Sequence, residues 1–410
     1  MRSPGNLYQY AMNQDAENLK PGDMGEKSAP AGQSMPSGSP PPADLPAPVR
    51  AAAGEGLAEL RRQIDELDRR IVELLNARAQ VVVEVGKIKR SSGVPIYAPD
   101  REKAVLDRIA ALNHGPLPQR TLAAIYRELM SGSFALEQPL RVGFLGPEGS
   151  FSHLAAARKF GASIEYLPLA DIRAVFEEVV RGHVSLGIVP IENSLGGGVI
   201  ETMDCFVDHD VTVVAEVQVE IHHNLLANCP PDRITMIASK PEVFAQCRQW
   251  LATSLPNLEQ IPVASSSRAA EMAAQQKGLA AIGSDLAAEL YGLKVIFENI
   301  EDNSNNMTRF LVIARQPAKR TGSDKTAVMF STAHRVGALV DVLNVFSRHG
   351  INLTNIDSRP SRRRNWEYFF FVDAEGHFED PNFAEALAEA RHHCGELHVL
   401  GSFPRATEPI

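Results

Sequence analysis

The chain is poor in cysteine and tryptophan, and it contains no long apolar run. We expect its scattered cysteines to be reduced thiols of a cytosolic protein, because none form the C-x-x-C pairs of a metal or redox site. The four are Cys205, Cys229, Cys247 and Cys394. No apolar run approaches the ~18 residues of a membrane span, so no membrane partner is expected. A net charge of −9 argues against a nucleic-acid partner.

Residues 1–53 lack hydrophobic periodicity. Proline, glycine, serine and alanine dominate this stretch, with Pro40-Pro41-Pro42 near its centre. Such a composition cannot bury enough apolar surface to fold, so we predict a disordered extension. It has neither the basic start nor the apolar core of a signal peptide. Three methionines leave the true start of translation open: Met1, Met24 and Met35.

The rest of the chain is long enough for two or three domains. Its first segment has an apolar residue at every third or fourth position, which predicts one long helix packed along its length. This apolar stripe comprises Leu57, Leu60, Ile64, Leu67, Ile71 and Leu74, then Val81 or Val82, Val85 and Ile88. Arg78 falls on the same stripe. A permanent charge there must meet an anion or carry a desolvation cost, so the stripe is predicted to line an anion site.

Lys89 supports an anion site on this helix. It follows Arg78 by 11 residues (from 78 to 89), which returns to nearly the same face about 16 Å further along the axis. Arg61 precedes Arg78 by 17 residues (from 61 to 78), about 25 Å, and faces elsewhere. Arg61 can therefore serve the same kind of site only from a second copy of the chain. For Arg61 or Lys89 alone, a solvated surface charge is the alternative.

Two shorter helices are predicted to close the site. One begins at Asp100 after a proline-bounded break and runs to about Leu112, and the next runs from about Pro118 to Glu137. Ser133 lies four residues before Glu137, so the two share a helix face. Three helices, one of them very long, cannot bury the stripe alone. We therefore expect an intertwined homodimer or a higher homo-oligomer.

A run of residues along these helices matches a known pattern: Leu60-Arg61, Asp65, Leu67-Asp68, Leu74-Leu75, Arg78, Val83-Glu84-Val85-Gly86-Lys87, Lys89 and Asp100-Arg101-Glu102. It resembles the all-helical chorismate mutases, above all the amino-terminal domain of the bifunctional chorismate mutase–prephenate dehydratases. The resemblance implies that chorismate rearranges to prephenate in one pericyclic step without cofactor or metal. Such an enzyme must hold a folded dianion and stabilise charge on the ether oxygen, for which cations and one hydrogen-bond donor suffice.

The resemblance also implies roles for individual residues. Lys89 would donate to the ether oxygen, and Glu102 would accept from the ring hydroxyl. Three arginines would meet the substrate carboxylates or order the site: Arg61 of the partner subunit, Arg78 and Arg101. Ser133 and Glu137 fall at the family's last two substrate contacts. Ala98 stands where some members have aspartate, so only a backbone contact could survive there. Glu137 stands where many relatives have a glutamine that donates to the ether oxygen.

From Leu140 onward the predicted strands and helices alternate. The first strand and its turn carry glycines spaced G-x-x-G-x-x-G, not the G-x-G-x-x-G of a dinucleotide-binding turn, so no nicotinamide cofactor is expected. The chain builds a second α/β block after about Val219 and returns with a strand at 306–313. This order predicts a two-lobed α/β domain, of the periplasmic-binding kind, with a ligand cleft between its lobes.

Four local motifs of this region resemble prephenate dehydratase over about 140–316: Gly146-Pro-Glu-Gly-Ser-Phe-Ser152, Pro190-Ile-Glu-Asn-Ser194, Tyr291-Gly-Leu293 and Thr308-Arg-Phe310. The family places its essential threonine at Thr308. We expect this hydroxyl to act as a positioned donor to the departing hydroxide, with Glu192 as one candidate proton source. Asn193, Ser194 and Arg309 are further substrate-site candidates. The alternative for these three is structural: a turn-forming Asn-Ser pair and an arginine on a solvent face.

The last region has the predicted order β-α-β-β-α-β over 325–405, which is a ferredoxin-like α+β fold. It resembles an ACT regulatory domain, with Gly337-Ala338-Leu339 opening its first helix and Asp357-Ser358-Arg359-Pro360 ending its second strand. In dehydratases these two segments bind phenylalanine at a domain–domain interface, so phenylalanine is the expected effector. Val336 replaces the usual proline, and Asp357 the usual glutamate. A dimerisation domain without a ligand is the alternative.

Together these observations predict a cytosolic enzyme with an all-α mutase domain at 54–138, a two-lobed α/β dehydratase domain at 140–316 and an ACT domain at 325–405. It would convert chorismate to prephenate and prephenate to phenylpyruvate, with feedback inhibition by phenylalanine. One alternative is a two-lobed ligand-binding or regulatory protein without dehydratase activity. Another is a mutase joined to a prephenate dehydrogenase, which would need the nicotinamide site that the glycine spacing excludes.

Overall fold

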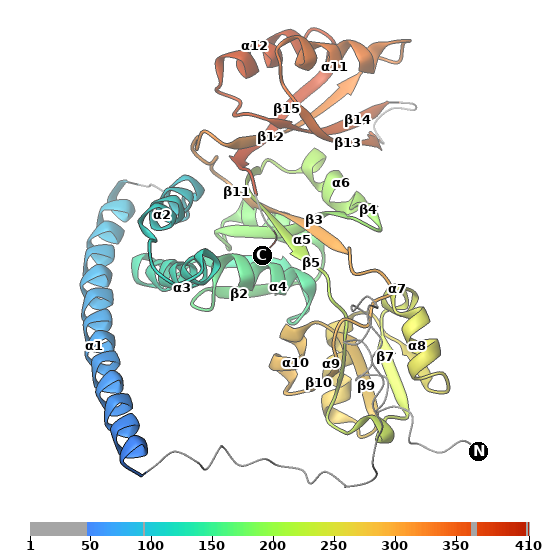
Figure 1. Cartoon of the computed structure of the whole chain (residues 1–410). Coiled ribbons are helices and arrows are strands. Elements are labelled where there is room, and N and C mark those ends of the chain that lie inside the picture. The colour runs from blue at the N-terminus through green and yellow to red at the C-terminus, as the bar shows by residue number, and fades with distance from the viewer. Residues whose placement is uncertain (1–46, 93–94, 362–366, 407–408, 410) are drawn as a thin grey trace, which may run out of the picture. The chain divides into compact units, whose positions relative to one another are not determined.

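The computed structural model describes residues 47–92, 95–361, 367–406 and 409 (Figure 1). The chain divides into two compact units, Met1–Arg78 and Ala79–Ile410. The predicted disorder of residues 1–46 lies outside the described residues. For residues 47–53 the prediction of disorder is wrong, because helix α1 spans Ala47–Ser92. Alanines dominate this short stretch, and a proline in the first helical turn is tolerated, so the local sequence favours a helix.

Three helices make up the first region, as the periodicity predicted. They are α1, then α2 (Pro99–Leu112) and α3 (Gln119–Glu137). The apolar stripe of α1 is exposed to solvent in the single chain, to 57% at Leu60 and 69% at Leu74. Exposed leucines at regular helical spacing are typical of a surface that another chain covers.

The first dehydratase lobe is built on a mixed sheet with strand order β2-β1-β3-β11-β5. Its strands are β1 (Arg141–Leu145), β2 (Glu165–Leu169), β3 (Leu186–Asn193), β5 (Thr212–Glu220) and β11 (Met307–Ala314), with the short β4 (Gly197–Gly198) paired to β3. Strands β1, β2 and β3 are parallel, and β11 runs antiparallel to both of its neighbours. The helices of this lobe are α4 (Phe151–Phe160), α5 (Ile172–Arg181) and α6 (Ile200–Asp208).

The second lobe has the strand order β10-β6-β9-β7-β8. Its strands are β6 (Asn224–Ala227), β7 (Met236–Ser239), β8 (Glu259–Pro262), β9 (Leu279–Gly283) and β10 (Lys294–Phe297). Its helices are α7 (Pro241–Gln246), α8 (Arg248–Ser254), α9 (Ser266–Gln275) and α10 (Asp285–Tyr291), with a 3-10 turn η2 (Pro231–Arg233). Helices α7 and α8 meet at Cys247. The chain enters this lobe after β5 and leaves it before β11, as predicted.

The last region has the predicted order of elements: β12 (Asp324–Thr332), α11 (Ala338–Arg348), β13 (Leu353–Pro360), β14 (Tyr368–Glu375), α12 (Pro381–Ala390) and β15 (Cys394–Pro404). Its antiparallel sheet has the strand order β13-β14-β12-β15. One face packs on α11 and α12. The other face shares a hydrophobic core with the first dehydratase lobe, because Phe371 and Met329 belong to the same buried cluster as Leu311 and Val213.

Within the described part of the chain, no helix is both long and apolar enough to cross a membrane. The same residues contain no group of three histidine, cysteine or acidic side chains that could hold a metal ion. All four cysteines are free. Burial raises the pKa of the Cys205 thiol to about 11 and that of Cys247 to about 12, so both stay protonated at neutral pH.

Candidate active sites

The first candidate site forms where the end of α1 meets the end of α3. Gly86 permits this approach, because a Cβ atom there would lie 2.8 Å from the Cα atom of Glu137. One turn later the Lys89 ammonium donates to Glu137 Oε2 at 2.7 Å and to the carbonyl of Ile96 at 3.1 Å. Arg90 donates to the Glu137 carbonyl. The structure therefore joins the two side chains to which the resemblance gives a role at the ether oxygen of the substrate.

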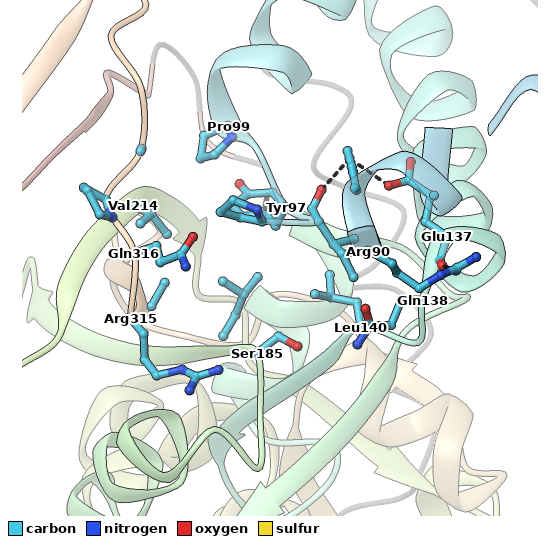
Figure 2. A pocket seen from close by; sticks show the side chains of 18 residues that line it. Arg90, Tyr97, Pro99, Glu137, Gln138, Leu140, Ser185, Val214, Arg315 and Gln316 are labelled. Atoms are coloured by element: carbon cyan, nitrogen blue, oxygen red, sulfur yellow. Dashed lines mark hydrogen bonds and ion pairs between the residues drawn. The ribbon is translucent and has the colours of Figure 1, made fainter. Parts of the chain in front are cut away.

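A cavity of about 530 Å³ adjoins this pair (Figure 2). Lys89 and Glu137 contribute to its wall from the helical region. Leu140, Ser185 and Arg315 contribute from the dehydratase region, so the cavity lies between the two. Tyr97 and Pro99 line it from the segment that opens α2.

Glu102 forms a second group of contacts in this region. Its carboxylate accepts two hydrogen bonds from Lys159 of α4, at 3.0 and 3.1 Å, and one from the Tyr97 hydroxyl at 3.0 Å. Burial, together with the nearby charge of Glu102, raises the pKa of Tyr97 well above its ordinary value. The phenol thus stays protonated and donates. Neither Tyr97 nor Lys159 could be recognised from the sequence, because neither belongs to a motif.

The remaining predicted mutase residues occupy three different places. Ala98 is the N-cap residue of α2 and offers no capping side chain, but its carbonyl accepts from the backbone amides of Arg101 and Glu102 at 3.0 Å. The Arg101 side chain is exposed on α2. Ser133 is buried on α3, and its hydroxyl donates to the carbonyl of Leu129 at 2.6 Å. Both Arg61 and Arg78 lie on α1; Arg61 is exposed and Arg78 is half-buried.

The second candidate site is built around Thr308, the second residue of β11. Asn193 of β3 lies directly opposite it, and Asn193 Nδ2 donates to Thr308 Oγ1 at 2.9 Å. The orientation of this amide follows from its other contacts, because Asn193 Oδ1 accepts from the backbone amides of Leu195 and Gly196. Thr308 Oγ1 is therefore an acceptor toward Asn193, which leaves its own proton available for a substrate.

Ser194 ties the end of β3 to the strand that carries Thr308. Its backbone amide donates to the Met307 carbonyl at 2.8 Å, and its hydroxyl accepts from the Met307 amide at 2.9 Å. Glu192 lies opposite Arg309 across the two strands. Residues that face each other in an antiparallel pair share one face of the sheet, so Glu192 lies on the face opposite to Thr308. This register does not support Glu192 as the proton source behind Thr308.

The turn at 146–152 lies where the two dehydratase lobes approach each other. Gly149 has a φ of +77°, which a glycine adopts without strain, and a Cβ atom there would lie 3.3 Å from both Ala287 and the Ser267 hydroxyl of the second lobe. Ser284 donates to the Gly149 carbonyl at 3.1 Å. Ser150 caps α4 by accepting from the amide of His153. Gly149 is thus explained by the contact between the lobes and not by a dinucleotide turn.

Arg309 points away from Thr308, because successive strand residues face opposite sides of a sheet. Its guanidinium donates to Glu216 of β5 at 2.9 Å and to Asp373 of β14. The structure therefore places this candidate at the boundary between the dehydratase sheet and the last sheet.

The two predicted phenylalanine segments lie in different surroundings within one chain. Gly337, Ala338 and Leu339 border a cavity of about 270 Å³. The segment Asp357–Pro360, including Ser358, ends the edge strand β13. Arg359 makes two hydrogen bonds to Asp204 of α6, at 2.8 and 3.1 Å.

Comparison with known proteins gives three family matches that follow one another along the chain. Residues 60–138 match the family model of chorismate mutase type II, residues 142–318 that of prephenate dehydratase, and residues 326–392 that of the ACT domain. The three matched ranges correspond to the helical region, the two lobes and the last sheet.

The chain is also similar to proteins described as bifunctional chorismate mutase/prephenate dehydratases. The chain is 45% identical over 357 residues to the bifunctional chorismate mutase/prephenate dehydratase of Stutzerimonas stutzeri, covering 85% of this chain and 98% of that protein. It is 42% identical to the protein of the same description from Aquifex aeolicus, covering 86% and 99%. A solved structure of prephenate dehydratase in complex with L-Phe from Arthrobacter aurescens matches with a TM-score of 0.61 and 34% identity, covering 66% of this chain and 92% of that one. The chain belongs to the family of bifunctional chorismate mutase/prephenate dehydratases, and it has both activities.

Proposed function

We propose that Lys89 and Glu137 belong to the mutase site, that Thr308 and Asn193 belong to the dehydratase site, and that phenylalanine regulates the enzyme through the ACT domain. The observation that carries this proposal is the pairing of these residues: the lysine with the glutamate, and the asparagine with the threonine. We propose 54–138, 140–316 and 325–405 as the three domains. The direct test supplies chorismate to the purified full chain and follows prephenate and phenylpyruvate, with and without phenylalanine. Prephenate that accumulates without phenylpyruvate would contradict the proposed dehydratase site.

In the mutase reaction the ether C–O bond of chorismate breaks while a new C–C bond forms. Negative charge builds on the ether oxygen, and the Lys89 ammonium is the donor that we assign to it. Arg78, Arg101 and Arg61 of the partner subunit are assigned to the substrate carboxylates or to ordering the site. Glu102 is the acceptor for the ring hydroxyl, and Tyr97 and Lys159 hold its carboxylate. Ser133 and the backbone of Ala98 complete the proposed contacts.

In the dehydratase reaction the ring hydroxyl and the carboxylate of prephenate leave together. The C–C bond to the carboxylate breaks, its electron pair enters the ring, CO₂ departs, and the C–O bond to the hydroxyl breaks. The departing oxygen needs a proton, or a strong hydrogen bond, to leave as water. Thr308 is the donor that we assign, because Asn193 already satisfies its oxygen as an acceptor. Ser194 and Asn193 also fix the backbone that carries it.

The exposed stripe of α1 supports a homodimer in which each mutase site takes Arg61 from the second chain. Arg61 and Arg78 are 17 residues apart (from 61 to 78) on one helix, about 25 Å along its axis. Leu60, Leu67 and Leu74 lie exposed along the same helix. An intertwined dimer would bury them and bring Arg61 of the partner subunit to Arg78.

A mixing experiment tests this shared site. Arg61→Ala and Arg78→Ala proteins should each have very low mutase activity. After subunit exchange, each heterodimer has one intact site of two, so random mixing should restore about a quarter of wild-type mutase activity. The measurement is prephenate formation after mixing, with the heterodimer fraction read by native mass spectrometry. Heterodimers without any recovery would contradict a shared site.

Glu137→Gln should raise mutase activity at neutral and alkaline pH. An ionised Glu137 cannot donate to the ether oxygen, and it also holds the Lys89 ammonium at 2.7 Å. A glutamine amide donates at every pH and does not attract the lysine as a charge. The measurement is mutase kcat/KM from acid to alkaline pH in both proteins, with dehydratase activity as the internal control. A flat wild-type profile that the substitution leaves unchanged would contradict this role for Glu137.

Phenylalanine is the effector that we propose for the ACT domain. The solved prephenate dehydratase from Arthrobacter aurescens is described in complex with L-Phe. In this chain Gly337–Leu339 border a cavity, and Asp357–Pro360 lie on an edge strand that a second copy can reach. We propose the cytosol as the compartment, because all four cysteines are free thiols.

A further inference from the structure

Four charged side chains lie buried where the dehydratase sheet meets the ACT sheet. Arg309 of β11 and Glu216 of β5 come from the dehydratase sheet, and Lys325 of β12 and Asp373 of β14 come from the ACT sheet. Their side chains are between 0% and 12% exposed. We call these residues the four-charge cluster. It holds two positive and two negative groups, so its charges balance only while both domains contribute.

Arg309 connects the two domains within this cluster. Its Nε atom donates to Glu216 Oε2 at 2.9 Å, and its Nη1 atom donates to Asp373. Lys325 donates to the same Glu216 oxygen at 3.3 Å. Arg309 Nη2 is buried without a hydrogen-bond partner among the described residues. The guanidinium is rigid and planar, so the two carboxylates, one from each sheet, together fix its position.

The surroundings of the cluster are apolar, which makes its ion pairs sensitive to loss of a partner. Side chains two positions apart on a strand lie on the same face of the sheet. On this face Arg309 is followed by Leu311, Lys325 by Ala327, and Asp373 is preceded by Phe371. All three belong to one hydrophobic core. Burial alone would lower the pKa of Arg309, but the charges of Asp373 and Glu216 more than offset it, and the pKa is raised. Without Asp373 the guanidinium would keep its charge, but it would lose one of the two carboxylates that balance this charge.

The cluster is adjacent in sequence to the proposed dehydratase residue. Thr308 immediately precedes Arg309 on β11 and faces the other side of the sheet. The pairing of β11 with β3 shifts register between Arg309 and Phe310. Both residues precede this irregular step, so the positions of the Arg309 side chain and of the Thr308 hydroxyl are linked through the peptide bond between them and through their regular pairing with Glu192 and Asn193.

The other end of the cluster adjoins the strand that carries a proposed effector segment. Asp373 on β14 lies opposite Asn355 on β13. Asn355 Nδ2 donates to Asp357 Oδ2 at 3.4 Å, and the Thr354 hydroxyl donates to the Asp373 carbonyl at 3.4 Å. A movement of β13 would therefore displace Asp373, because β13 and β14 are paired directly.

We infer that Asp373 of the ACT domain is a positioning residue for the dehydratase reaction, which acts through Arg309 on the neighbouring Thr308. The inference rests on the proposed role of Thr308. The ion pair between Arg309 and Asp373 sets the active geometry, and an ACT domain that withdraws Asp373 leaves Arg309 misplaced and the dehydratase slow. Loss of Asp373 therefore imitates the inhibited state of the enzyme.

The test is a double-mutant cycle in the full chain, with dehydratase activity measured on supplied prephenate. Asp373→Asn keeps the size of the side chain and removes its charge. It should lower kcat about tenfold or more, with less than about a threefold change in KM, and leave mutase activity unchanged. The double variant Arg309→Gln/Asp373→Asn should be no slower than Arg309→Gln alone, because both substitutions break the same contact. Phenylalanine should lower the kcat of Asp373→Asn less than that of wild type.

Asp204→Asn is the matched control, because it also removes a charge from an ion pair between the two domains, the one with Arg359. Its dehydratase kcat should stay at the wild-type value. If Asp373→Asn does not fold, Asp373→Glu keeps the charge but shifts it by one methylene, and it should lower kcat in the same direction. The inference would be overturned if the folded Asp373 variant had the kcat of wild type. It would also be overturned if the effects of the two single substitutions on kcat multiplied in the double variant. An active Thr308→Ala protein would instead contradict the proposed function.

Discussion

Thr308→Ala is expected to lower the dehydratase kcat on supplied prephenate by about 10³-fold or more, since loss of one positioned donor in an active site typically costs 10²–10³. Departure of the ring hydroxyl needs a hydrogen-bond donor, and the substitution removes the only side-chain proton that the proposed site directs to it. Asn193 Nδ2 would also lose one of its acceptors, the Thr308 hydroxyl at 2.9 Å. The measurement is phenylpyruvate formation from prephenate. Mutase activity of the same protein, measured on chorismate, should stay near that of wild type.

Two further substitutions separate the hydroxyl from the shape of the side chain. Thr308→Ser keeps the hydroxyl and should retain part of the activity. Thr308→Val keeps the branched shape and should be as slow as the alanine variant. If the serine and valine variants had the same kcat, the hydroxyl of Thr308 would not be the donor.

The helices of the mutase domain could be predicted because their apolar residues repeat at helical spacing. The same periodicity could not show that α1 begins at Ala47, since that stretch has helix-forming residues but no apolar repeat. Strands β6 and β10 could not be predicted from the sequence. Each has four residues, and β6 is buried at all four positions, so it shows none of the alternation by which a half-buried strand is recognised.

The motifs placed Asn193 and Thr308 in one site, and the register of β3 and β11 brings them opposite each other. The sequence could not show what surrounds these motifs. Asp373 is 64 residues from Arg309 in the sequence, and Glu216 is 93 residues away. Lys159 is 57 residues from Glu102 and belongs to a different domain. Contacts of this range depend on how sheets and helices pack, and a single charged residue carries no local signal of its partner.

Placement on opposite faces of a strand explains why adjacent motif residues differ in role. Thr308 and Arg309 belong to one motif, which predicts both as site residues. Strand alternation directs Thr308 toward Asn193 and Arg309 toward the ACT sheet. Under the proposed function, this motif holds a reacting group and a connection to a neighbouring domain at successive positions.

Lys89→Ala is expected to lower mutase kcat/KM by about 10²-fold or more, or about 2.7 kcal/mol of barrier. The ammonium is the charge assigned to the ether oxygen, where negative charge builds as the C–O bond breaks. In the structure it donates to Glu137 and to the Ile96 carbonyl. The measurement is the rate of chorismate loss, with dehydratase activity on supplied prephenate as the control for folding.

Lys87→Ala is the matched control for Lys89. It removes the same charge two residues earlier on α1, where Lys87 pairs with Glu84 on the exposed surface. Exposed pairs of this kind contribute little, so its mutase activity should stay near wild type. Arg78→Ala should behave like Lys89→Ala, because a guanidinium on the apolar stripe is assigned to a substrate carboxylate. Near-normal mutase activity in the Lys89 variant would remove this lysine from the site. An equal loss in the Lys87 variant would show instead that any change of charge at the end of α1 disturbs the packing of α1 against α3.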